Sequence, residues 1–89
     1  MRVEVLLFGR PRELAGASEE ALSIEDGACL ADLFKSLGAR HGPELAVELA
    51  SPERFMILIN GRHYGPLGGM QTELKNGDKV AIVPAVIGG

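Results

Sequence analysis

The strongest constraint on the fold comes from two segments near opposite ends of the chain that are apolar on both faces. Residues 2–9, RVEVLLFG, alternate as a strand does, and from Leu6 onward both faces are apolar. Residues 79–84, KVAIVP, repeat this pattern, and Pro84 ends the segment because proline cannot donate a ladder hydrogen bond. Two-sided apolarity is typical of strands covered on both faces. We therefore expect the first and last strands to lie side by side in the middle of one sheet.

Two hairpins are predicted between these segments. Residues 19–26, EEALSIED, read as a second strand that pairs antiparallel with the first, across a loop holding one helical turn over residues 12–15. Further on, the sequence RFMILINGRHY carries Asn60–Gly61, which suits the two positive-φ positions of a type I′ turn. That turn should join a strand over 55–59 to a short strand over 62–64.

The hydrophobic period changes to that of a helix over residues 27–42, GACLADLFKSLGARHG. Its apolar side chains recur every three or four residues, which predicts one buried stripe formed by Leu30, Leu33, Phe34 and Leu37. Gly42–Pro43 should end this helix, and a second short helix is expected over 44–50. Residues 65–78 are rich in glycine and are expected to form a loop that closes in an Asn–Gly turn at 76–77.

Together these elements predict an α+β fold, a mixed sheet with one main helix packed across it. The chain has 89 residues, enough for one domain, which we expect to span residues 1–84. Residues 85–89, which follow the last strand, are expected to form a flexible tail that ends in two glycines.

Composition excludes several classes of function. A net charge of −3, a pI near 5.3 and an aromatic content of 4% argue against nucleic-acid binding. The single cysteine cannot form an internal disulfide, which fits a reducing compartment. Neither a signal peptide nor a membrane-spanning apolar run is visible. We therefore expect a cytoplasmic domain that binds no membrane.

Side chains within the domain offer little chemistry. His41 and His63 stand in different elements and have no metal-ligand spacing, so no metal site is expected. Cys29 begins the predicted helix, where the dipole lowers a thiol pKa, but without a partner it is favoured as a packed or capping residue over a nucleophile. Arg10 and Arg12 either contact an acidic partner or remain solvated.

The tail carries the most distinctive chemical group, the α-carboxylate of Gly89. Transfer of this carboxylate to a nucleotide phosphate would give an acyl-adenylate that sulfur or amine nucleophiles can attack. Because Gly88 and Gly89 have no side chains, they could enter a narrow channel in another enzyme. Three roles of the tail remain open: transfer of the activated carboxyl group to sulfur, its transfer to an amine, and a binding module whose tail forms no covalent bond.

The chain resembles the MoaD/ThiS group of ubiquitin-like sulfur carriers, which have the β-grasp fold. The resemblance is carried by VLLFGRPRELAG, DGACLADLF and LKNGDKVAIVPAVIGG. It implies activation by a ubiquitin-activating-type adenylating enzyme (MoeB/ThiF-like), which would adenylate Gly89 and allow a sulfur donor to form a thiocarboxylate there. That enzyme would use the ATP, and the chain would hold no cofactor stably.

Within this group the resemblance is to small subunits of molybdopterin synthase. It implies that the tail enters a large subunit (MoaE-like) and delivers sulfur there for the molybdenum cofactor, while this chain is a non-catalytic subunit. Gly88 and Gly89 would be the essential tail residues, and partners would bind Phe8, Val83, Pro84, Ala85, Val86 and Ile87. Ala85 replaces a second proline of the group, and Ile87 is unusually bulky. Carriers for cysteine, thiamine or tRNA thiolation, and modifiers joined to lysines, share similar tails.

Overall fold

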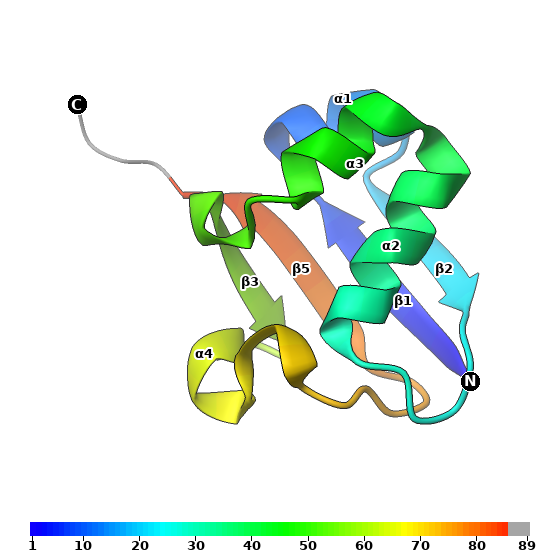
Figure 1. The fold of residues 1–89 in the computed structure, drawn as a ribbon, viewed down its shortest axis with the longest axis vertical. Coiled ribbons are helices and arrows are strands. Elements are labelled where there is room, and N and C mark those ends of the chain that lie inside the picture. The colour runs from blue at the N-terminus through cyan, green and yellow to red at the C-terminus, as the bar shows by residue number, and fades with distance from the viewer. Residues whose placement is uncertain (86–89) are drawn as a thin grey trace.

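A computed structural model describes residues 1–85 of the chain (Figure 1). Residues 86–89 lie outside the described part, so the division into a domain of residues 1–84 and a tail of residues 85–89 stays a prediction. The elements follow in the order β1 (Arg2–Leu7), α1 (Gly9–Ala15), β2 (Glu19–Ser23), α2 (Leu30–His41), α3 (Pro43–Leu49), η1 (Pro52–Arg54), β3 (Phe55–Ile59), β4 (Arg62–His63), α4 (Tyr64–Leu67), η2 (Gly69–Gln71) and β5 (Lys79–Pro84).

The five strands form one mixed sheet in the order β2-β1-β5-β3-β4. Strands β1 and β5 run parallel in its middle, with Leu7 opposite Ile82, while the β1–β2, β3–β5 and β3–β4 pairs are antiparallel. The predicted α+β class and the central pairing of the first and last strands are therefore confirmed. Asn60 and Gly61 have φ values of 51° and 83°, which confirms the turn between β3 and β4.

Helices α2 and α3 lie on one side of this sheet, as Figure 1 shows. The predicted stripe of α2 is buried and packs with the inward-facing residues of the strands to form the core. Fully buried residues include Val3, Val5, Leu7, Leu30, Leu33, Leu37, Ile57, Val80 and Ile82. Helix α3, predicted over 44–50, is present and buries Leu45 and Leu49.

One expectation about the sheet is wrong: its second face is not covered as the first is. Phe8 and Met56 belong to this face, and each is 43% exposed. The two-sided apolarity of β1 and β5 therefore does not arise from burial on both sides. It leaves an apolar surface, whose residues are described below.

Two segments expected as loops contain helix. The single turn predicted over 12–15 is the seven-residue helix α1, which buries Pro11 and ends at Gly16, where φ is 75° and the N–H donates to the Arg12 carbonyl at 2.9 Å. The glycine-rich stretch after β4 forms α4 and η2. Within residues 1–85, no helix is both long enough and apolar enough to cross a bilayer.

Candidate docking surface and tail root

Six apolar side chains on the uncovered face of the sheet form two parallel rows. Leu6, Ala81 and Leu58 are register partners across β1, β5 and β3. In the next row Met56 is the register partner of Val83. Phe8 belongs to the same row, because it comes one residue after Leu7 and Leu7 is the partner of Ile82. We call this set the outer sheet patch; it comprises Leu6, Phe8, Met56, Leu58, Ala81 and Val83.

The outer sheet patch has the character of a docking surface. All six residues are at least partly accessible, and none of the six carries a charge. Contiguous exposed apolar side chains on a small domain mark interaction sites, because leaving them in water has a free-energy cost. The alternation along β1, β3 and β5 places these side chains opposite the core, so a partner can cover them without disturbing it.

The chain leaves the sheet beside this patch, at what we call the tail root, Pro84 and Ala85. Pro84 is the last residue of β5 and pairs with Phe55. The Ala85 N–H donates to the Arg54 carbonyl oxygen at 3.0 Å, although Ala85 itself is exposed. The backbone is therefore held by hydrogen bonding up to Ala85, the last described residue.

The structure thus brings part of the predicted site together. Phe8 and Val83 belong to the patch, and Pro84 and Ala85 form the tail root, while Val86, Ile87, Gly88 and Gly89 lie outside the described residues. Sequence reasoning did not name the other four patch residues, Leu6, Ala81, Met56 and Leu58. The signal was present, because every second residue of FMILI must face away from the core once the Asn–Gly turn sets the register of β3.

Cys29 stands at the N-cap of α2, in agreement with its interpretation as a capping residue. Its N–H donates to Asp32 Oδ2 at 3.0 Å, and its Sγ lies 3.3 Å from the same oxygen. These hydrogen bonds, the backbone one first, lower the pKa of Asp32, and Lys35 adds to the effect.

The two histidines lie in separate places. His41 Nε2 is 2.6 Å from Glu20 Oε1, which ties the end of α2 to β2. His63 caps α4, where its Nδ1 accepts from the Gly65 N–H at 3.1 Å. Among residues 1–85 there is no cluster of three histidine, cysteine or acidic residues suited to a metal ion.

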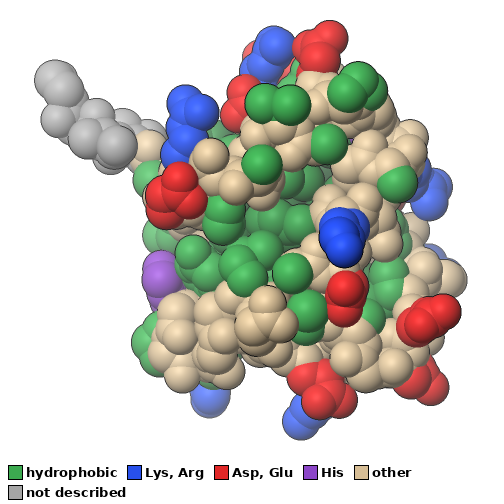
Figure 2. Space-filling model, in the orientation of Figure 1, with side chains coloured by type: hydrophobic (Ala, Val, Ile, Leu, Met, Phe, Trp, Pro, Cys, Tyr) green, Lys and Arg blue, Asp and Glu red, His purple; other side chains and the backbone are tan. Residues whose placement is uncertain are grey.

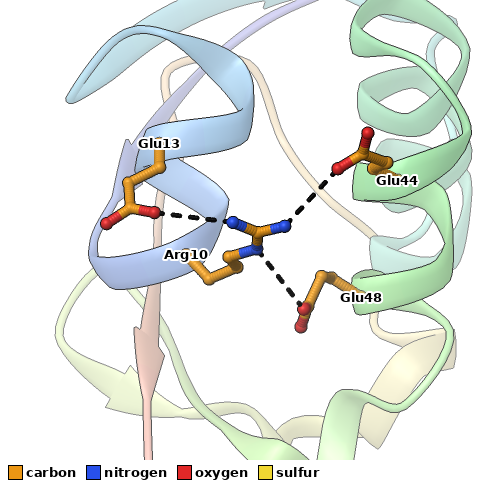
Figure 3. A network of polar contacts seen from close by, with 4 residues as sticks. All are labelled: Arg10, Glu13, Glu44 and Glu48. Atoms are coloured by element: carbon orange, nitrogen blue, oxygen red, sulfur yellow. Dashed lines mark hydrogen bonds and ion pairs between the residues drawn. The ribbon is translucent and has the colours of Figure 1, made fainter.

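Arg10 binds carboxylates of its own chain (Figure 3). Its guanidinium group lies 3.4 Å from Glu44, 3.7 Å from Glu13 and 3.9 Å from Glu48. The arginine thus links α1 to α3 while its side chain stays 55% exposed, and it lies in a helix where a loop was expected. Glutamates surround it on both sides and leave the cluster with a net negative charge.

The helix side of the molecule carries a separate groove. Figure 2 shows hydrophobic side chains gathered in a hollow on this side. A groove of about 480 Å³ is lined by α2, α3 and residues that include Pro52 and Met70, and Lys35 is the one charged residue along it. Apart from Lys35 this lining is uncharged and mostly apolar, so the groove offers space rather than a set of reactive groups.

The sheet order and the crossing helix define a class of protein. A mixed sheet with parallel first and last strands at its centre, two antiparallel hairpins outside and a helix across one face is the ubiquitin-like β-grasp fold. The family comparison agrees, since the profile of the ThiS family matches residues 5–89. The chain belongs to this family of ubiquitin-like sulfur carriers.

Individual relatives match over the whole chain. A molybdopterin synthase sulfur carrier subunit from Chlamydomonas reinhardtii is 34% identical over 89 residues, and the alignment covers 100% of both chains. Small archaeal modifier protein 3 from Haloferax volcanii is 32% identical over 92 aligned residues, again with 100% of both covered. The solution structure of a protein from Haloferax volcanii superposes with a TM-score of 0.84 at 33% identity, covering 100% of this chain and 87% of that one.

Proposed function

We propose that this protein is the sulfur-carrying small subunit of a molybdopterin synthase. The single observation that carries the proposal is the match over its full length to a molybdopterin synthase sulfur carrier subunit. In this role the chain is a non-catalytic co-substrate. Its Gly89 carboxylate is charged by one enzyme and discharged by another, and neither step needs a catalytic side chain from this domain.

The charging reaction uses ATP bound by an adenylating enzyme of the ubiquitin-activating type. The Gly89 carboxylate oxygen attacks the α-phosphorus, pyrophosphate leaves, and an acyl-adenylate forms. A hydrosulfide equivalent then attacks the carbonyl carbon, AMP leaves, and a thiocarboxylate remains on Gly89. Because glycine has no Cβ, no side chain hinders either attack.

Two features of the described residues support a chain that carries sulfur while its partner enzymes supply the catalytic groups. The outer sheet patch gives both enzymes an apolar surface to bind, centred on Phe8, Val83 and Met56. The tail root lies at the end of β5 beside that patch, so a partner bound to the patch lies next to the point where the tail begins. The residues that bind the partner and the residue that carries the sulfur are therefore different parts of the chain.

A second candidate function, a modifier joined to lysines, is favoured by one observation. The chain matches small archaeal modifier protein 3 over the full length of both proteins. Activation at Gly89 would be the same, but a lysine amine would attack the adenylate-derived acyl group in place of sulfur. The product would then be an isopeptide bond to another protein.

A sulfur-transfer assay tests the molybdopterin proposal. The thiocarboxylated protein is mixed with its large subunit and the pyranopterin precursor, and dithiolene formation is followed together with loss of sulfur from Gly89. We expect stoichiometric loss of sulfur only when both are present. Persistence of the thiocarboxylate with that client, and its consumption by a cysteine-forming, thiamine-forming or tRNA-thiolating enzyme, would move the chain to another pathway.

A further inference from the structure

Gly9 makes an unusually close approach to the tail root. It follows Phe8 of the outer sheet patch, has a φ of 62°, and packs directly against the ring of Pro84. A Cβ added at residue 9 would lie 2.5 Å from Pro84 Cγ and 3.3 Å from its Cδ. Ordinary van der Waals contact begins at 3.4 Å, so one of the two segments would have to move by about 1 Å. The proline ring cannot swing aside, because it is closed onto its own backbone.

The opposite side of the tail root is held by the backbone of β3 and η1. Phe55 is the register partner of Pro84, and the Arg54 carbonyl accepts the Ala85 N–H at 3.0 Å. The Phe8 N–H donates to the Ile82 carbonyl at 3.3 Å, which fixes the start of the Gly9 segment on β5. Pro84 therefore lies between Gly9 on one side and Phe55 on the other, and Ala85 is held through the Arg54 carbonyl.

We propose that Gly9 is a positioning residue for the reactions at Gly89. The absence of a side chain at residue 9 lets Pro84 sit against the β1–α1 junction, and this contact sets where the chain after Ala85 begins relative to the outer sheet patch. A partner docked on that patch then receives the tail in the correct place. The inference rests on the proposed adenylation of Gly89 and adds to it a residue that touches neither ATP nor the carboxylate.

The chain offers a matched control for this contact. Gly16, at the other end of α1, has a φ of 75°, and a Cβ built there meets nothing within 4 Å. Gly9→Ala and Gly16→Ala therefore impose similar backbone strain on the same helix, while only the former pushes on Pro84. A third variant, Gly9→Ala with Pro84→Ala, removes the ring atoms that the new methyl group meets and is compared with Pro84→Ala alone.

The assay is ATP-dependent adenylation of each full-length variant by the activating enzyme, with kcat and KM for the carrier measured separately. We expect Gly9→Ala to lower kcat by about tenfold or more, since a misplacement of about 1 Å can reduce a rate by about 100-fold. Its KM should stay within about threefold, because the outer sheet patch is intact. Gly16→Ala should change neither constant by more than about twofold. A general loss of stability in α1 would instead affect both variants.

An NMR measurement provides a readout that does not depend on activity. The amide proton of Ala85, bonded to the Arg54 carbonyl, should shift and exchange faster with solvent in Gly9→Ala but not in Gly16→Ala. In the Pro84→Ala background, Gly9→Ala should have little further effect on kcat. If Gly9→Ala alone fails to fold, the comparison of the double variant with Pro84→Ala still tests the positioning role.

The outcomes separate this inference from the proposed function. If the wild-type chain is adenylated but Gly9→Ala behaves as Gly16→Ala does, the positioning role is refuted and the carrier function stands. A rise in KM with kcat unchanged, or an equal loss of kcat in the Pro84→Ala background, would also refute the positioning role. If the wild-type chain is never adenylated, the proposed function fails and the role of Gly9 fails with it.

Discussion

Replacement of Phe8 by alanine should weaken partner binding by an amount that follows from its exposure. Phe8 is 43% exposed, and because a phenylalanine presents about 200 Å², about 85 Å² of it remains for a partner to cover. At about 25 cal/mol per Å², covering this area contributes about 2 kcal/mol to binding. Phe8→Ala should therefore raise the Kd for the activating enzyme or the large subunit by about 30-fold.

Isothermal titration calorimetry of each variant against the partner measures this directly. Val47→Ala is the control, because Val47 on α3 is 73% exposed but lies outside the outer sheet patch. It should leave the Kd within about twofold, since a partner that binds the outer sheet patch does not cover Val47. An equal loss of affinity in the two variants, or a Kd for Phe8→Ala within about threefold of wild type, would refute the assignment of the patch as the docking surface.

Three further predictions concern the stability of the domain. Gly38→Ala should lower the free energy of unfolding by about 1 kcal/mol in urea titrations although alanine favours helix, because its Cβ would lie 2.9 Å from that of Ala46; a more stable variant would contradict this. Arg10→Ala should cost no more than about 1 kcal/mol, and the loss should shrink as salt is added; a loss independent of salt would point to packing. The lowered pKa of Asp32 means that its contribution to stability is complete above about pH 4 and is lost as the pH falls through the folded-state pKa. Asp32→Asn should therefore show a smaller loss of thermal stability on acidification than wild type. If the melting temperatures of the two proteins fall in parallel with pH, the hydrogen bonds from Cys29 to Asp32 do not cause the loss.

The parts of the fold that the sequence predicted are those with a clear hydrophobic period or a strong turn signal. The stripe of α2, the pairing of β1 with β5 and the turn at Asn60–Gly61 all have such local signals. Helix α1 was predicted only as a single turn over 12–15, because Pro11 and the flanking glycines are typical of loops. The buried Pro11 ring and packing on the core hold a seven-residue helix. The short helices after β4 depend on contacts such as His63 Nδ1 with the Gly65 N–H, which no periodicity reveals.

The candidate site was predicted on a different basis. Phe8, Val83 and Pro84 were identified through resemblance to a family, and their physical role needs the strand register that unites them with Met56. An apolar second face in a sequence has two explanations, a covering layer or a binding surface. The arrangement of the helices excludes the first here, because α2 and α3 pack on the other face (Figure 1) and leave Phe8 and Met56 exposed. The contact of Gly9 with Pro84 joins residues 75 positions apart and has no local signal.

The most direct test of the carrier function is the intact mass of the protein purified natively from its own cells, with fragmentation of the C-terminal peptide. We expect that a fraction of the molecules carries one sulfur in place of one oxygen at Gly89, and that removal of Gly89 abolishes this form. Gly89 found on lysines of other proteins would favour the modifier function instead. A free acid alone, even after incubation with the activating enzyme, ATP and a sulfur donor, would contradict sulfur transfer by this chain.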